Sequence, residues 1–279
     1  MTPEVLTLST FIQQTDIYAG LGTKTVKGMK SMVTLHIIPG LGRLALDELD
    51  TERLAAFRSC LKVKTPIYRN NIMRVLGKLL RLAVRKGMLS RCPEMPRPLR
   101  EARLRLEFSD NERLALLSAV QVLYPHAYPL FLSAFETGLS KCDLLTLTWD
   151  QVHMEEGVIL RERAKTGVTS RVPISSACRS ALESLEGREG LVFKTPRVCG
   201  FSEVVVNKYF KAAKLKAGIT RRARFHDVRH SFGSRLASAG VPLLFIRDAM
   251  GHSDAKTTLR YARVDQNASK AILAALDTP

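Results

Sequence analysis

The sequence predicts a mainly helical protein with two domains, the second of which is α+β and contains a small β-hairpin. Three observations predict this. Apolar residues recur at helical spacing through residues 1–88, a stretch with three prolines follows at 91–108, and a β-rich run comes later, at 157–175. A chain of 279 residues is long enough for two domains of ordinary size. We therefore expect a helical domain at 1–90, a linker at 91–108 and an α+β domain at 109–279.

Two helices of the first domain have clear start signals. One begins after Asp50, a residue type that accepts hydrogen bonds at helix N-termini. The next has Thr65 in the same role and Pro66 in its first turn, and Gly87 ends it. Apolar side chains of this second helix form a stripe that predicts a buried face: Ile72, Leu76, Leu79 and Ala83.

The same helix carries a second, basic stripe: Arg74, Lys78, Arg81 and Arg85. No acidic residue lies between them to form i,i+4 pairs, so the like charges repel one another unless a polyanion lies against them. The alternative is an ordinary solvated face. We expect these four side chains to contact phosphate groups.

The second domain opens with a capping box, Ser109 with Glu112. The run at 157–175 is typical of a hairpin around a Lys-Thr-Gly turn at 165–167. Helices are expected at 176–186, 202–217, 226–239 and 242–250. The segment 265–277 predicts a short amphipathic tail helix, which packs on its own domain or on a neighbouring copy.

The charge of the chain indicates its class of partner. Forty-three Lys and Arg against 26 Asp and Glu give a net charge of +17. Such an excess favours a polyanion, because neutralising phosphates releases condensed counterions. A generally basic protein, or one bound to ribosomes or acidic lipids, is the alternative. The bases gather in two patches, at 53–100 and 208–235, each with a single acid, and this clustering favours nucleic acid.

Other features of the sequence exclude classes of protein. No apolar run reaches about 18 residues, so no membrane span is expected. The first residues, MTPEVLTLSTFIQQ, lack the basic and apolar segments of a signal peptide. The five cysteines are odd in number and form no CxxC pair, which is typical of reduced thiols. A cytoplasmic protein is expected.

The segment FHDVRHSF places His226, Arg229 and His230 on one face of a helix. Its His-Asp-x-x-His order imitates a zinc motif, with Asp227 as the base. That interpretation is unattractive, because Arg229 would share the face with the metal and no third ligand is evident. His230 could equally be a histidine of the core. No metal is expected.

A second segment, GHSDAKTTLRY, places Tyr261 nine residues after His252. A tyrosine hydroxyl has a pKa near 10, so it attacks poorly unless positive charge stabilises the phenolate that forms. Lys165 lies at the predicted hairpin turn, where most lysines are simply solvated. In TGLSKCDLLTLTW, at 137–149, one helix is expected to end at Gly138 and another to begin.

Together these segments resemble the tyrosine recombinase (phage integrase) family. HDVRHSF is similar to its His-x-x-Arg box, GH with Tyr261 to its histidine and nucleophile boxes, and KTG to its hairpin lysine. The resemblance spans most of the chain. It implies a helical, SAM-like core-binding domain in front of a catalytic domain.

The resemblance implies that Tyr261 attacks a DNA phosphodiester, which gives a 3′-phosphotyrosyl link and a free 5′-hydroxyl. Arg229 would clamp the phosphate, His226 and His252 would donate hydrogen bonds or move protons, and Lys165 would protonate the leaving oxygen. No cofactor is required, because the covalent link stores the bond energy.

One position departs from the family pattern. The family has an arginine, half of its phosphate clamp, where this chain has Ser140. Losing one preorganised donor typically costs ~10²–10³ in rate. The adjacent Lys141 would point ~100° away around a helix, so it is a doubtful substitute. Ser140 is an engineered change, or native in a slow or compensated recombinase, or the mark of a protein that binds DNA without cutting it.

The resemblance also implies partners. They are double-stranded DNA, clamped between the two domains, and further copies of the chain, four of which would assemble on two DNA sites. Accessory DNA-bending proteins are compatible with it. The most favoured function is that of a site-specific integrase of a mobile element. The alternative is a catalytically inactive DNA-binding regulator or architectural protein of the same fold.

Overall fold

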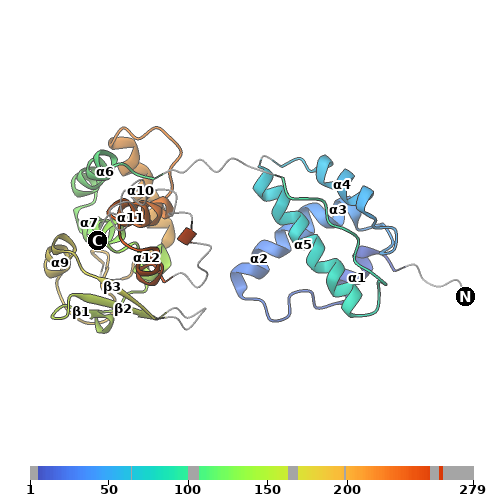
Figure 1. The fold of residues 1–279 in the computed structure, drawn as a ribbon, viewed down its shortest axis with the longest axis horizontal. Helices are drawn as coiled ribbons and strands as arrows, with labels where there is room; N and C mark the ends of the chain where they lie inside the picture. Colours follow the sequence, from blue (N-terminus) through green and yellow to red (C-terminus); the bar gives the residue numbers. More distant parts are fainter. Residues whose placement is uncertain are drawn as a thin grey trace, which may run out of the picture. The chain divides into compact units, whose positions relative to one another are not determined.

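The computed structural model describes residues 6–63, 65–99, 107–162, 169–197, 199–251 and 258–259. Contacts divide the chain into two compact units, Met1–Leu104 and Arg105–Pro279, shown in Figure 1. Each unit has a hydrophobic core of its own. No helix among the described residues is long and apolar enough to cross a membrane.

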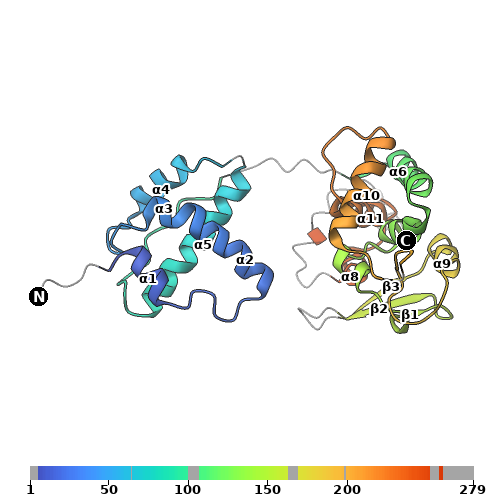
Figure 2. The ribbon, with the colours of Figure 1, turned by 180° about the vertical axis from the view of Figure 1, so that it is seen from behind.

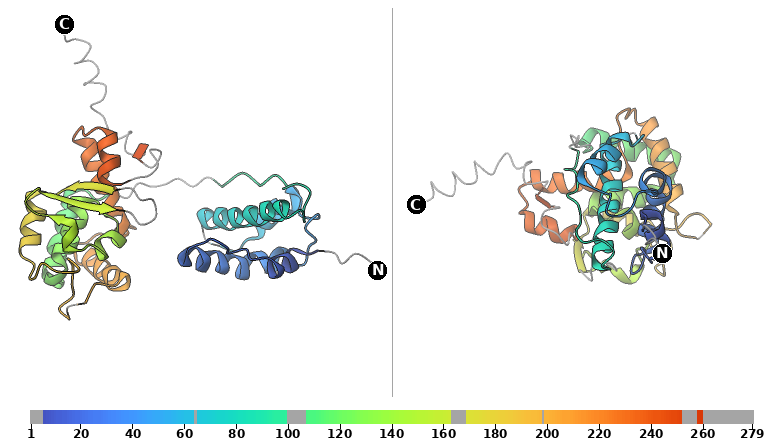
Figure 3. Two further views of the ribbon diagram at one scale, coloured as in Figure 1. Left: turned by 90° about the horizontal axis from the view of Figure 1, so that it is seen from below. Right: turned by 90° about the vertical axis from the view of Figure 1, so that its right-hand side faces the viewer.

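Among its described residues, the first unit contains helices and, apart from an isolated bridge between Thr7 and Ala45, no strand pairing. Its α5 forms one layer and the helices near the N-terminus form the other (Figure 3, left). A π-helical turn, Val33–Ile37, joins α2 to α3. The helices are α1 (Leu8–Gln14), α2 (Thr23–Met32), α3 (Ile38–Leu41), α4 (Thr51–Cys60) and α5 (Pro66–Arg85).

The predicted starts of α4 and α5 are confirmed. The Asp50 carboxylate accepts the Arg53 backbone N–H at 2.7 Å, and Thr65 Oγ1 accepts that of Tyr68 at 3.3 Å. Gly87, with a φ of +70°, ends α5 where the sequence predicts it. The predicted apolar stripe of α5 is buried in the core of the unit: Ile72, Leu76, Leu79 and Ala83.

The stretch predicted as a linker, 91–108, is divided between the two units. It begins within the first unit and ends within the second. Residues 91–99 have no regular structure, but Asn70 of α5 exchanges two hydrogen bonds of 2.9 Å with the Leu99 backbone. Phe108 lies in the core of the second unit with 8% of its surface exposed. Local signals did not predict this, because both contacts are tertiary.

The second unit combines helices with a three-stranded antiparallel sheet in the order β1-β2-β3. The mainly α fold with a small sheet is therefore confirmed. The strands are β1 (Val152–His153), β2 (Val158–Glu162) and β3 (Thr169–Pro173). The helices are α6 (Asp110–Leu123), α7 (Tyr128–Thr137), α8 (Lys141–Leu145), α9 (Ser176–Glu183), α10 (Glu203–Lys216), α11 (Phe225–Ser238) and α12 (Leu243–Ala249).

Helix α7 is the centre of this unit. It is buried along nearly its whole length and packs against α6, α9 and α11. Figures 1 and 2 show α6 and α10 at one end of the unit and the strands at the other. Helix α12 packs beside β3. The ends of α7 and α12 and the β2–β3 hairpin thus belong to one packed body.

Arg221 holds the start of this unit in place. It binds both carboxylate oxygens of Glu112 at 2.8 Å, donates to the Glu107 carbonyl at 2.8 Å and lies 5.0 Å from the Phe108 ring centroid. These bonds from the Arg221 guanidinium are the main reason that the pKa of Glu112 falls from 4.5 to about 2.

Glu112→Gln is expected to remove a pH-dependent part of the stability of the second unit. A carboxyl with a lowered folded-state pKa contributes stability that is present above its unfolded pKa of 4.5 and is lost as the pH falls toward 2. Urea unfolding can be followed through Trp149, the single tryptophan, which lies in this core. The stability gap between parent and variant should be full near neutral pH and shrink below pH about 4. A gap that stays constant with pH would contradict this role.

Candidate active site

The structure describes three of the six predicted catalytic positions, Ser140, His226 and Arg229. Lys165, His252 and Tyr261 lie outside the described residues. The elements that lead to two of them are described: β2 ends three residues before Lys165, and α12 ends three residues before His252.

Arg229 joins two parts of the chain that are far apart in sequence. Its side chain is buried on α11, with 5% of the residue exposed. One terminal nitrogen donates to the Gly138 carbonyl at 2.6 Å, and the other donates to the Met250 carbonyl. Gly138 ends α7 and stands two residues before Ser140, and Met250 stands two residues before His252. Arg229, in the HDVRHSF segment, therefore contacts the TGLSKCDLLTLTW segment and the residue that precedes GHSDAKTTLRY.

His226 and His230 lie on the same face of α11, as predicted. Their rings meet edge to face, with centroids 5.0 Å apart. His226 is exposed and His230 is half-buried, so His230 is not a fully enclosed core residue. Asp227 accepts the Arg224 backbone N–H at 2.7 Å and so caps the helix. No group of three potential metal ligands occurs among the described residues.

Ser140 is the N-cap of α8. Its hydroxyl donates to the Asp143 carboxylate at 2.6 Å and accepts the Asp143 backbone N–H at 3.3 Å, and the carboxylate also accepts the Ser140 N–H at 3.3 Å. This capping box could have been recognised in the sequence, because serine precedes aspartate by three residues. A serine therefore suits this turn locally, where an arginine would not cap the helix.

Lys141 is held away from Ser140. Its ammonium group donates to Asn207 at 3.1 Å and forms an ion pair with Glu203 at 3.2 Å, both on α10. The lysine next to Ser140 is thus engaged with α10, in line with the expectation that it would point elsewhere.

Sequence reasoning missed Arg161, which lies on β2. Its guanidinium donates to Gln151 Oε1 at 2.7 Å and to the Thr146 hydroxyl, and its Nε is 3.8 Å from an Asp143 oxygen. A single arginine in a short β-rich run carries no signal of such contacts. Asp143 therefore connects Ser140 to a second cationic side chain.

The basic stripe of α5 lies on the face opposite the apolar stripe. All four of its side chains are exposed: Arg74, Lys78, Arg81 and Arg85. Within the described part of the chain, no ion pair joins any of them to a carboxylate. Their charge remains available to an external anion.

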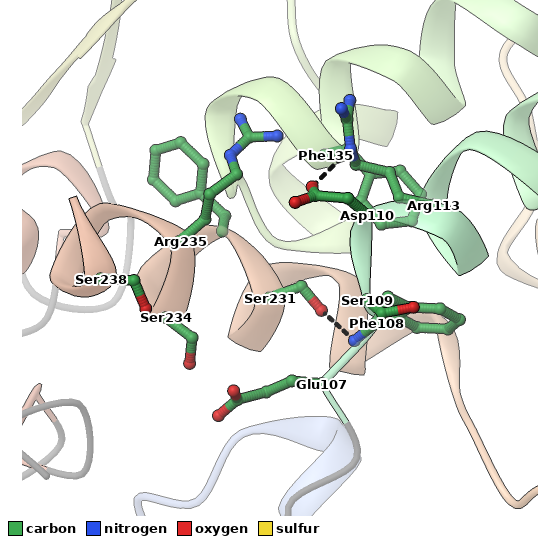
Figure 4. A pocket seen from close by; sticks show the side chains of 11 residues that line it. Glu107, Phe108, Ser109, Asp110, Arg113, Phe135, Ser231, Ser234, Arg235 and Ser238 are labelled. Carbon is green, nitrogen blue, oxygen red and sulfur yellow. Dashed lines mark hydrogen bonds and ion pairs between the residues drawn. The ribbon is translucent and has the colours of Figure 1, made fainter. Parts of the chain in front are cut away.

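A pocket of about 200 Å³ lies where the start of α6 meets α11 (Figure 4). Arg113, Ser234 and Arg235 are among its lining residues, and the Phe108 backbone N–H donates to Ser231 at its wall at 2.7 Å. Of the predicted catalytic positions that the structure describes, Ser140, His226 and Arg229, none lines it.

The sequence of the chain matches known recombinases. Residues 105–268 match the sequence model described as "Phage integrase family". The chain is 30% identical over 148 residues to the integrase of Salmonella phage P22, a match that covers 48% of this chain and 38% of that protein. It is 26% identical over 216 residues to the tyrosine recombinase XerD of Lacticaseibacillus casei, covering 72% of this chain and 73% of the relative.

Solved structures share the fold. An integrase of the Tn1549 transposon, in complex with a circular intermediate DNA, superposes with a TM-score of 0.82 at 18% identity, covering 97% of this chain and 99% of the other. A lambda integrase dimer bound to a core site gives 0.80 at 20% identity, with 94% and 97% covered. The family match spans more than half of the chain. The chain belongs to the phage integrase family, the tyrosine recombinases.

Proposed function

We propose that this protein is a site-specific DNA recombinase, an integrase of a mobile element that cuts and rejoins the strands of duplex DNA. One observation carries the proposal beyond family membership. Buried Arg229 bonds to the Gly138 and Met250 carbonyls, so the segments that lead to Ser140 and His252 meet at a guanidinium. A planar guanidinium suits a phosphate clamp, because it offers two parallel donors to the phosphate oxygens.

The proposed reaction needs no external energy source. The Tyr261 hydroxyl gives its proton to His226 or His252. Its oxygen attacks phosphorus and forms a 3′-phosphotyrosyl bond, while the bond from phosphorus to the 5′-oxygen breaks. Lys165 gives its proton to that leaving oxygen. Arg229, His226 and His252 stabilise charge on the nonbridging oxygens. Attack by the free 5′-hydroxyl of another strand reverses the step and reseals the DNA.

Charge supports the choice of DNA as the partner. The exposed basic stripe of α5 provides one contact surface, and the basic segment at 208–235 provides another. In this proposal the helical unit is the core-binding domain. Four protomers act on two DNA sites, an assembly supported by the solved lambda integrase tetramer bound to a Holliday junction.

A second candidate function is that of a DNA-binding regulator that does not cut. Ser140 favours it, because serine is neutral where the family pattern has an arginine. The neighbouring Lys141 is bound to α10 and does not supply that charge in the structure described. The two functions predict the same DNA binding and differ in covalent chemistry.

Covalent capture separates the two functions. The protein and its Ser140→Arg variant are incubated with a pool of nicked duplexes of random sequence. When the nick lies near the cleaved bond, the short strand with the free 5′-hydroxyl diffuses away, so the covalent adduct cannot be resealed. A recombinase forms adducts that survive denaturation, and the DNA recovered from these adducts is enriched in one target sequence. Tyr261→Phe should abolish them, because it removes the oxygen that forms the phosphotyrosyl bond.

Tyr128→Phe is the matched control, because it removes a half-buried tyrosine hydroxyl from the same unit. It should leave adduct formation unchanged. Sequence-specific DNA binding without adduct, in both the parent and Ser140→Arg, would overturn the recombinase and support the regulator.

A further inference from the structure

Arg161 occupies an unusual place for an arginine. In the β2–β3 ladder Ile159 pairs with Val172 and Arg161 pairs with Ser170. Side chains two residues apart lie on the same face of a strand, so Arg161 shares the face of Ile159, which is packed into the core. Only 14% of the Arg161 side chain is exposed. A buried charge is costly unless it is paired and hydrogen-bonded, so this position calls for specific partners.

Among the described residues, the side-chain partners of Arg161 lie on α8 and in the segment that follows it, up to Gln151. Nη1 donates to Gln151 Oε1 at 2.7 Å and to the Thr146 carbonyl at 3.4 Å, and Nη2 donates to the Thr146 hydroxyl. Nε forms an ion pair with Asp143 at 3.8 Å. The guanidinium thus binds the helix of Ser140 and the turn after it, across 10 to 18 residues of sequence.

These contacts of Arg161 are made at the C-terminal end of β2, where the strand has the fewest pairing partners in the sheet. In the part of the sheet that the structure describes, β1 pairs with Val158 and Ile159, and the last three residues of β2 pair with β3 alone. A two-stranded ribbon is marginally stable by itself. The Arg161 side chain supplies a second attachment at this end, and the chain leaves β2 one residue later, at Glu162.

We propose that Arg161 is a positioning residue for the proton transfer to the leaving 5′-oxygen. The inference rests on the proposed function, in which Lys165, four residues further along the chain, is the general acid. A general acid must come within about 3 Å of the atom that it protonates. A misplacement of about 1 Å can cost 10²-fold in rate, so the strand that precedes Lys165 has to be held firmly. Arg161 ties this strand to the helix that begins at Ser140.

The test uses the chemistry of the leaving group. The duplex recovered by covalent capture is prepared with either oxygen or sulfur bridging the scissile phosphorus and the 5′-carbon. A thiolate leaves without a proton, so a defect in proton transfer slows cleavage of the oxygen substrate alone. Arg161→Met removes every donor and keeps the aliphatic stem. We expect it to slow cleavage of the oxygen substrate by about tenfold or more and that of the sulfur substrate by about twofold or less.

Arg171→Met is the matched control. Arg171 lies on β3 of the same hairpin with 64% of its side chain exposed, paired with Glu156 at 3.4 Å. It should leave both rates within about twofold of the parent, since exposed ion pairs contribute little. Arg161→Lys keeps the charge but lacks the planar fork, so it should show the same selective loss in weaker form. This variant replaces Arg161→Met if thermal unfolding shows that the methionine variant is not folded.

The outcomes distinguish this inference from the proposed function. Lys165→Ala should lose cleavage of the oxygen substrate and keep that of the sulfur substrate. An equal loss on both substrates in the Arg161 variants, or no loss, overturns the positioning role and leaves the recombinase intact. Absence of adduct with either substrate, in the parent and in Ser140→Arg, overturns both proposals.

Discussion

Replacing Ser140 by arginine is expected to raise the rate of covalent adduct formation by about 10²–10³-fold. In the proposed reaction Arg229 is one half of the phosphate clamp, and Ser140 occupies the position of the other half. The serine hydroxyl is already used, because it donates to Asp143 at 2.6 Å. An arginine there would add a preorganised charged donor beside the nonbridging oxygens. Single-turnover cleavage of a nicked duplex measures the effect.

The same substitution should lower the stability of the second unit. Ser140 caps α8, and loss of a serine cap typically costs about 1 kcal/mol. Ser140→Ala is the matched control, because it removes the cap and adds no charge. It should lose similar stability and gain no activity. Equal rates for the parent and Ser140→Arg would show that position 140 does not limit the reaction.

Gly138→Ala is expected to destabilise the second unit by about 2–5 kcal/mol. Gly138 has a φ of +60°, a conformation that costs a residue with a Cβ about 1–2 kcal/mol. An added Cβ would also lie 2.2 Å from a ring carbon of Phe232, which is buried, and overpacking of this kind costs a further 1–3 kcal/mol or so. Urea unfolding followed by Trp149 fluorescence measures the loss.

Two further variants isolate the causes of this loss. Gly218 has a φ of +69° with nothing within 4 Å of the Cβ position, so Gly218→Ala should show the backbone cost alone. Phe232→Leu in the Gly138→Ala background should recover part of the stability by relieving the clash. Equal losses for Gly138→Ala and Gly218→Ala would contradict the close packing of Gly138 on Phe232.

A clash at Gly138 should also disturb the candidate active site. The Gly138 carbonyl accepts a hydrogen bond from Arg229, so displacement of this turn moves an acceptor that orients the guanidinium. Adduct formation by Gly138→Ala, measured at a temperature where the variant is folded, should therefore fall, while Gly218→Ala should retain the activity of the parent.

Local sequence determined where many elements begin and end. Asp50, Thr65 and Ser109 each accept a backbone N–H three residues ahead, and Gly87 ends α5 in a left-handed conformation. These signals could be recognised because a capping side chain and the backbone N–H that it accepts lie within one turn of helix. The period of the apolar residues likewise predicted the buried face of α5.

The family motifs extended the prediction to the chemistry. Their spacing alone pointed to Arg229 and Ser140. The capping box of Ser140 with Asp143 was equally local, and its serine-to-aspartate spacing makes it recognisable in the sequence. The charge of α5 and its lack of interleaved acids were also evident in the sequence.

Only the tertiary structure decided which side chains these elements bring together. Arg229 reaches Gly138 across 91 residues, and Lys141 is bound to α10 across 66. No sequence pattern indicated the contacts of Arg161, because its partners belong to a helix and a turn that fold back onto β2. Caps and apolar stripes are set by neighbours within one or two turns of chain. The contacts of a buried guanidinium depend on how distant elements pack, and short-range patterns carry no record of that packing.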